Sequence, residues 1–199
     1  GASRGVERVH HWAAQKYISG CPILPIDASN GFNATSRKVI LSASERVDTL
    51  FGRGMAKFYG LSSVAYLGLE AETIVSEEGS RQGCVAGGLG FCASVQPAYG
   101  DTLQKHDIHA RAIIDDFVTT TTGPPGSDTR PWKKEFENLA AALGYYTVKI
   151  ETDLNLQVNP TKLDLLLPLN APNPATHIFP DGIRLTREGL KIGGAPIGS

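Results

Sequence analysis

The stretch Ala112-Ile113-Ile114-Asp115-Asp116-Phe117 places two carboxylates side by side at the end of a short apolar run. Adjacent carboxylates repel one another, and burial adds to the cost unless a cation or solvent relieves it. A second apolar run, Cys21 to Ile26, is likewise followed by an acidic residue, Asp27. If the two runs are neighbouring strands, three carboxylates meet at one end of a sheet. Such a cluster can hold two magnesium ions for phosphoryl transfer.

Each acidic position also has an ordinary interpretation. Aspartate favours turns, so Asp115-Asp116 taken alone is typical of a solvated turn. Asp27 taken alone is typical of a helix cap or a turn residue. The choice between these interpretations depends on the motifs that surround the three residues.

The composition indicates a globular protein. The chain has 199 residues, of which 41% are hydrophobic and 20% charged, and this is enough for one domain with a core. No apolar stretch approaches the ~18 residues of a membrane span, and no signal peptide is recognisable. The three cysteines are odd in number and lack metal-ligand spacing, so they are interpreted as small buried residues of an intracellular protein. The net charge of −1 gives no global basic surface for nucleic acid, although a basic groove can be local.

The pattern of apolar, glycine and proline residues predicts an α+β domain, with helices on one face of a mainly antiparallel sheet. The segment 145–153 is ambiguous between helix and strand. The predicted elements are a strand at 22–28, a helix at 35–51, hairpin strands at 62–67 and 71–75, a Gly-rich helix at 84–99, strands at 109–114 and 117–121 around an Asp115-Asp116 turn, a helix from Pro131 to Gly144, strands at 154–158 and 163–167, and a last β unit over 183–197.

Short motifs accompany the acidic residues in a fixed order. They are Asp27 with Phe32, Gly79-Ser80-Arg81-Gln82-Gly83 with Leu89-Gly90-Phe91, Ile113 to Asp116, Asn159 with Lys162, and Leu190 to Gly198. In this order they resemble motifs A to E of the palm domain of reverse transcriptases, most closely those of non-LTR retrotransposons. The resemblance covers nearly the whole chain, so residues 1–199 are identified as a palm-centred fragment that lacks most of the fingers and the thumb.

The resemblance implies an RNA-directed DNA polymerase that works by two-metal nucleotidyl transfer. Asp27 and Asp115 would bridge two Mg²⁺ ions, with Mn²⁺ as an alternative, and Asp116 ranks below them. The carbonyl of Ala28 would add a ligand. Lys162 would protonate the leaving pyrophosphate, although a surface lysine after a turn is the ordinary interpretation.

The resemblance also implies a nucleotide pocket and its partners. The ring of Phe32 would lie under the incoming sugar and exclude a 2′-hydroxyl, and its ordinary interpretation is a core phenylalanine. The implied partners are an RNA template, a DNA primer and deoxynucleoside triphosphates, with no membrane. The remaining pocket residues would be Asn30, Gly31, Arg81, Gln82 and Gly83.

Some positions depart from the family pattern and leave alternatives open. Ile113 stands where an aromatic residue is usual, Gly87-Gly88 replaces a Ser-Pro step, and Gly31 replaces an alanine. The main alternative is therefore a catalytically inactive palm relic that acts as a nucleic-acid or protein scaffold. Gly88 to Ala93 also fits a dinucleotide-binding pattern, but no clear strand precedes it and no βαβ unit follows.

Overall fold

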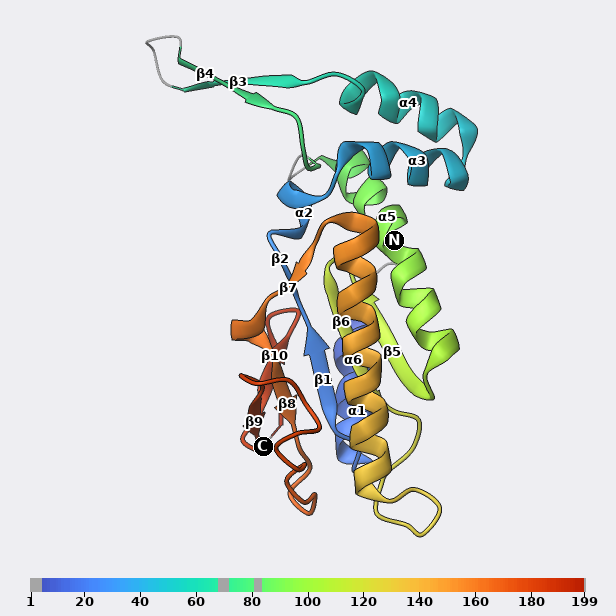
Figure 1. The fold of residues 1–199 in the computed structure, drawn as a ribbon, viewed down its shortest axis with the longest axis vertical. Coiled ribbons are helices and arrows are strands. Elements are labelled where there is room, and N and C mark those ends of the chain that lie inside the picture. Colours follow the sequence, from blue (N-terminus) through green and yellow to red (C-terminus); the bar gives the residue numbers. More distant parts are fainter. Residues whose placement is uncertain (1–4, 68–71, 81–83, 199) are drawn as a thin grey trace. The chain divides into compact units, whose positions relative to one another are not determined.

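The computed structural model describes residues 5–67, 72–80 and 84–198, and their contacts form two compact units. Unit 1 comprises Gly1–Ala28, Tyr99–Val148 and Val158–Ser199, and unit 2 comprises Ser29–Ala98 and Lys149–Gln157. Figure 1 shows the elements of both units. In the described ranges, no helix combines the length and the apolar character that crossing a bilayer would require.

A five-stranded sheet forms the centre of unit 1, in the order β5-β6-β1-β8-β9. All neighbouring strands are antiparallel except β8 and β9, which are parallel. This confirms the predicted α+β class with a mainly antiparallel sheet. The strands are β5 (Ile108–Ile113), β6 (Asp116–Thr121), β1 (Ile23–Ile26), β8 (Asp164–Leu166) and β9 (Arg184–Thr186).

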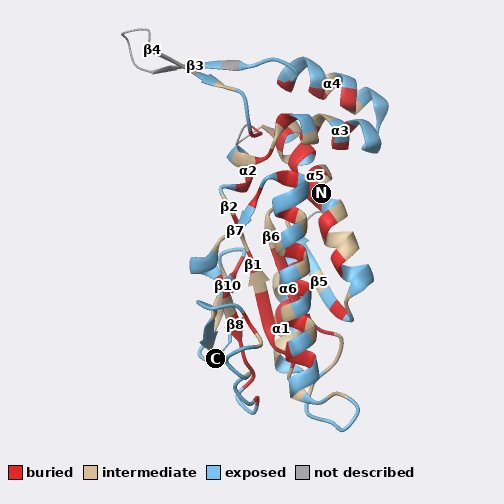
Figure 2. Cartoon of the chain, viewed as in Figure 1, coloured by how far each residue is buried: buried red, intermediate tan, exposed pale blue. Residues whose placement is uncertain are grey.

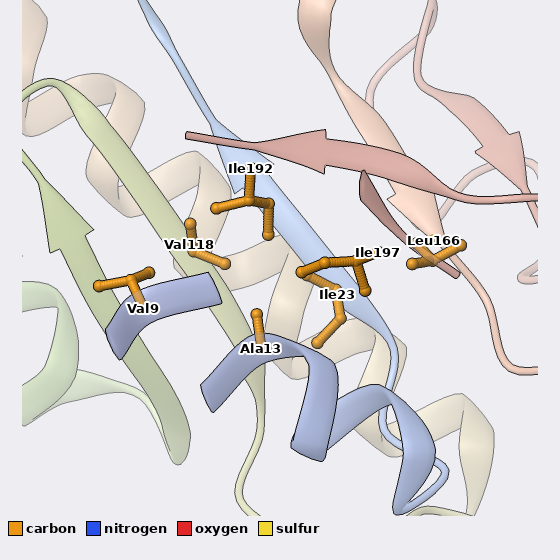
Figure 3. Close-up of a cluster of buried hydrophobic side chains, with 7 residues drawn as sticks. All are labelled: Val9, Ala13, Ile23, Val118, Leu166, Ile192 and Ile197. Carbon is orange, nitrogen blue, oxygen red and sulfur yellow. The ribbon is translucent and has the colours of Figure 1, made fainter. Parts of the chain in front are cut away.

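Side chains of β6 alternate between two covered faces of this sheet. Phe117 faces α5 (Val85–Lys105) and α6 (Trp132–Leu154), where it packs against Tyr99 and Tyr146. Val118 points to the opposite face. There it belongs to a buried cluster with α1 (Gly5–Ile18), which was not predicted, and with the hairpin of β10 (Leu190–Ile192) and β11 (Ala195–Ile197), as Figure 3 shows.

Unit 2 contains α2 (Gly31–Ala34), α3 (Arg37–Val47), α4 (Thr49–Tyr59) and a hairpin of β3 (Ser63–Leu67) and β4 (Glu72–Ser76). The hairpin was predicted. The side chains of Ile40 in α3 and of Met55 and Tyr59 in α4 form a buried cluster of unit 2, and buried positions recur along these two helices in Figure 2. The prediction of a single helix over 35–51 was wrong, because Asp48 adopts an extended backbone with φ −163° and caps a second helix.

Two further corrections concern α6 and the segment after it. Gly144 does not end the helix, which continues to Leu154, so the ambiguous segment is helical and the predicted strand at 154–158 is reduced to β7 (Gln157–Val158). Strand β7 forms a two-stranded sheet with β2 (Ala28–Ser29). A short 3₁₀ helix, Pro160–Lys162, follows it.

Candidate active site

The three predicted carboxylates meet at one end of the sheet of unit 1. In the antiparallel pair β1–β6, Ile26 lies opposite Phe117, so Asp27 leaves β1 beside the start of β6. Asp116 is the first residue of β6, and Asp115 precedes it. The two apolar runs of the sequence are therefore neighbouring strands, as expected.

The turn that carries Asp115 has an unusual backbone. Ile113 and Asp116 are paired, so the turn consists of Ile114 and Asp115 rather than the predicted Asp115-Asp116. Ile114 has a φ of +55°, which a β-branched residue rarely adopts. This left-handed conformation costs about 1–2 kcal/mol for a residue with a Cβ. Strain of this kind persists only where the surroundings hold it, often at functional sites.

Lys162 and Asn159, which follow α6 in the chain, contact Asp27. The Nζ atom of Lys162 lies 3.0 Å from Oδ2 of Asp27. The backbone N–H of Asn159 donates to the Asp27 carbonyl at 2.8 Å, and its side-chain amide lies 3.5 Å from Oδ2. Asn159 also caps the 3₁₀ turn by accepting from the Thr161 N–H at 3.1 Å. The turn thus holds the lysine against Asp27.

The pKa values of Asp115 and Asp116 are both raised in this site. Burial is the main cause that raises the pKa of Asp116 to about 6, and the charges of Asp115 and Asp27 and a hydrogen bond with Asp27 add to it. Burial also raises the pKa of Asp115. The pKa of Lys162 is raised, mainly by its hydrogen bond with Asp27. Among the described residues, the ammonium of Lys162 faces these three carboxylates.

Carboxylate oxygens are the ligands that Mg²⁺ prefers, so the residues fit such an ion in kind. In the part of the chain that the structure describes, no group of three or more His, Cys, Asp or Glu side chains is arranged as a ready metal site. Asp27 is paired instead with the ammonium of Lys162, 3.0 Å from its Oδ2.

A stack of aromatic side chains includes Phe117, the residue after Asp116, and the sequence did not predict this stack. Tyr99 stacks on Phe117 with ring centroids 4.6 Å apart, and Phe117 lies 4.8 Å from the ring of Tyr146. Burial raises the pKa of Tyr146, and the charges of Asp115 and Asp27 add to this shift. Tyr146 extends the apolar helical spacing of Leu139 and Leu143, a signal that reading Gly144 as a stop obscured.

The predicted nucleotide-pocket residues are distributed differently. Ala28 is buried directly after Asp27. Asn30, with φ +51°, precedes α2 in unit 2, where Phe32 stacks on Phe91 at 4.6 Å. Gly31 is the buried first residue of α2. Arg81, Gln82 and Gly83 lie outside the described residues.

Comparisons with known proteins bear on the fold. No protein-family model and no curated protein sequence matches the chain. Among solved structures, the chain is similar to apo telomerase from Candida tropicalis truncated from its C-terminal domain, with a TM-score of 0.55 and 9% sequence identity. The match covers 97% of this chain and 38% of the telomerase chain. This likeness supports a polymerase palm-like arrangement of an antiparallel sheet and its helices.

Proposed function

We propose that the chain is the palm-centred part of an RNA-directed DNA polymerase, a reverse transcriptase of the non-LTR retroelement type. The observation that carries the proposal is the convergence of Asp27, Asp115 and Asp116 at one sheet end, with Lys162 bound to Asp27. The fold likeness to a telomerase supports it, and so does the order of the sequence motifs. The partners would be an RNA template, a DNA primer and deoxynucleoside triphosphates.

Each residue of the site has a role in this proposal. Asp27, Asp115 and Asp116, with the carbonyl of Ala28, would hold two Mg²⁺ ions. When bound, these ions would favour the ionised primer 3′-hydroxyl and neutralise the triphosphate. Lys162 keeps its proton at neutral pH and is 63% exposed, so it can reach outward and donate to the leaving pyrophosphate.

The proposed nucleotide pocket completes the reaction. Phe32 would pack under the sugar of the incoming nucleotide and exclude a 2′-hydroxyl, which selects deoxynucleotides. Asn30, Gly31, Arg81, Gln82 and Gly83 would line the same pocket. The half-buried position of the Phe32 ring leaves a face for such contact.

Primer extension on an RNA template with Mg²⁺ tests the proposal directly. It is measured for the 199-residue chain and for the product of the full gene. We expect Asp115→Asn to lower the extension rate about 100-fold or more, because a carboxylate that holds a metal stabilises the transition state by several kcal/mol. The exposed loop variant Asp128→Asn is the matched control. Equal rates for Asp115→Asn and wild type would contradict the metal role.

The scaffold alternative is favoured by one observation. The ammonium of Lys162 lies 3.0 Å from Oδ2 of Asp27 and so balances the charge of that carboxylate. A scaffold would bind nucleic acid in a gel-shift assay equally well with and without Asp27→Asn and would show no Mg²⁺ binding by calorimetry. Saturable Mg²⁺ binding that Asp27→Asn abolishes would favour the polymerase.

A further inference from the structure

The hydroxyl of Tyr99 makes a contact that the proposed reaction does not use. It donates a hydrogen bond of 2.9 Å to the backbone carbonyl of Ile114. Its ring is stacked on Phe117 at 4.6 Å and on Tyr146 at 5.6 Å between ring centroids. Tyr99 of α5 thus contacts one peptide group of the turn, and Tyr146 of α6 packs against Tyr99.

That peptide group joins Ile114 to Asp115. Ile114 has the positive φ of 55° that a β-branched side chain disfavours. Asp115 is the other residue of this two-residue turn, between the paired Ile113 and Asp116, so the backbone of the turn sets where its carboxylate lies. A turn that relaxed to a negative φ at Ile114 would rotate this peptide and carry the carboxylate with it.

We propose that Tyr99 is a positioning residue that holds the strained Ile114–Asp115 turn and thereby fixes the Asp115 carboxylate for metal binding. The hydroxyl does this through the Ile114 carbonyl, and the stacked rings of Phe117 and Tyr146 fix the direction in which the hydroxyl points. The inference rests on the function proposed above. It adds a residue of α5, outside the sequence motifs, to the groups on which the metal site depends.

The variant Tyr99→Phe removes the hydroxyl and keeps the ring, so it separates the hydrogen bond from packing. The matched control is Tyr145→Phe, because the Tyr145 ring lies 4.3 Å from the Lys105 ammonium and outside this stack. A second variant, Ile114→Asn, places at the turn a residue that tolerates positive φ far better than isoleucine. It should restore the turn in the Tyr99→Phe background.

The first measurement uses the metal-free protein. Amide hydrogen exchange and the ¹³C shift of the Ile114 carbonyl are recorded by NMR. We expect exchange at the turn to be about fivefold faster in Tyr99→Phe than in wild type or Tyr145→Phe, with a displaced carbonyl shift, because one hydrogen bond is lost. Identical exchange and an identical carbonyl shift in Tyr99→Phe and wild type would overturn the proposal whatever the protein catalyses.

The second measurement is Mn²⁺ binding, followed by the electron paramagnetic resonance signal of the free ion. We expect Tyr99→Phe to bind Mn²⁺ about fivefold more weakly than wild type, and Tyr99→Phe with Ile114→Asn to recover most of the loss. Wild-type binding that Tyr99→Phe leaves unchanged would overturn this inference alone. Absence of Mn²⁺ binding by the wild type would instead overturn the proposed function, and this inference with it.

Discussion

At the residue scale, the site is defined by an imbalance of charge. Asp27, Asp115 and Asp116 are brought together by strand pairing, and in the described part of the chain the ammonium of Lys162 contacts Asp27. Burial is the main cause that raises the pKa of Asp116 to about 6, and the charges of Asp115 and Asp27 add to it. The repulsion between these carboxylates would be reduced by a bound divalent cation.

The pH dependence of stability follows from Asp116. Its folded-state pKa of about 6 exceeds the ~3.9 of an unfolded aspartate, so the folded state binds the proton more tightly. This contribution to stability is present below about pH 4, is lost as pH rises through about 6, and leaves the ionised group disfavoured above. We therefore expect Asp116→Asn, without metal, to raise the melting temperature at pH 8 and to flatten its change between pH 4 and 6.

Calorimetric scans at a series of pH values check this expectation, with the exposed Asp128→Asn as the control. Addition of Mg²⁺ at pH 8 should reduce the advantage of the asparagine variant, because the ion stabilises the wild-type carboxylates. Equal melting temperatures for Asp116→Asn and wild type at pH 8 would show that ionised Asp116 does not destabilise the folded state.

At the element scale, the junction of α3 and α4 shows where a sequence pattern was insufficient. Apolar spacing predicted one helix over 35–51, and the spacing does continue through Val47 and Phe51. The chain nevertheless turns at Asp48, whose carboxylate accepts the Phe51 N–H at 2.8 Å. A single aspartate in a helical pattern can be exposed or can cap, and only the tertiary packing of α3 on α4 decides between these states.

Cap strength at this junction can be measured. Asp48→Ala removes the acceptor of the Phe51 N–H, and we expect it to lower the free energy of unfolding by about 1 kcal/mol. Ser36 occupies the corresponding position of α3 without a side-chain cap bond, so Ser36→Ala should change stability by only a few tenths. Urea titrations followed by circular dichroism compare the two. A larger loss for Ser36→Ala would contradict this assignment.

Two glycines of α4 give a sharper comparison of packing. A Cβ at Gly52 would lie 2.7 Å from the Glu45 Cα of α3, whereas a Cβ at Gly54 would meet nothing within 4 Å. We expect Gly52→Ala to destabilise the protein by about 1–3 kcal/mol, because backbone must move. Gly54→Ala should stabilise it by about 0.5–1 kcal/mol, because alanine is the better helix former. The same urea titrations measure both, and destabilisation of equal size would contradict the close approach.

The strand assignments that place the site were predictable, and the contacts around it were not. Alternating or continuous apolar runs located β1, β5 and β6, so the meeting of Asp27 with Asp115 and Asp116 could be expected. No sequence pattern specified the positive φ of Ile114 or the Tyr99 contact, because both depend on which side chains meet after folding. The pairing of Lys162 with Asp27 is of the same kind: the motif located the lysine, and the fold determined its partner.

At the scale of the whole molecule, the core of unit 1 is built from parts of the chain that are far apart in the sequence. Val9 and Ala13 of α1 share one buried cluster with Ile192 and Ile197 of the C-terminal hairpin, over the face of the sheet that carries Val118. Figure 3 shows these side chains directed toward one another. The sheet end that carries the carboxylates therefore belongs to a unit whose core needs both the first helix and the last strands described.

The contribution of the C-terminal hairpin can be tested with one residue type. Ile192 is 2% exposed in this cluster, whereas Ile18, at the end of α1, is 83% exposed. We expect Ile192→Ala to lower the free energy of unfolding by about 2–4 kcal/mol, because it removes buried methyl groups and leaves a cavity. Ile18→Ala should change it by less than about 0.5 kcal/mol. Urea unfolding followed by tryptophan fluorescence reports on unit 1, because both tryptophans, Trp12 and Trp132, belong to it. A similar small effect for the two variants would mean that the hairpin is dispensable for the core, and that the carboxylate-bearing sheet is stabilised by α5 and α6 without it.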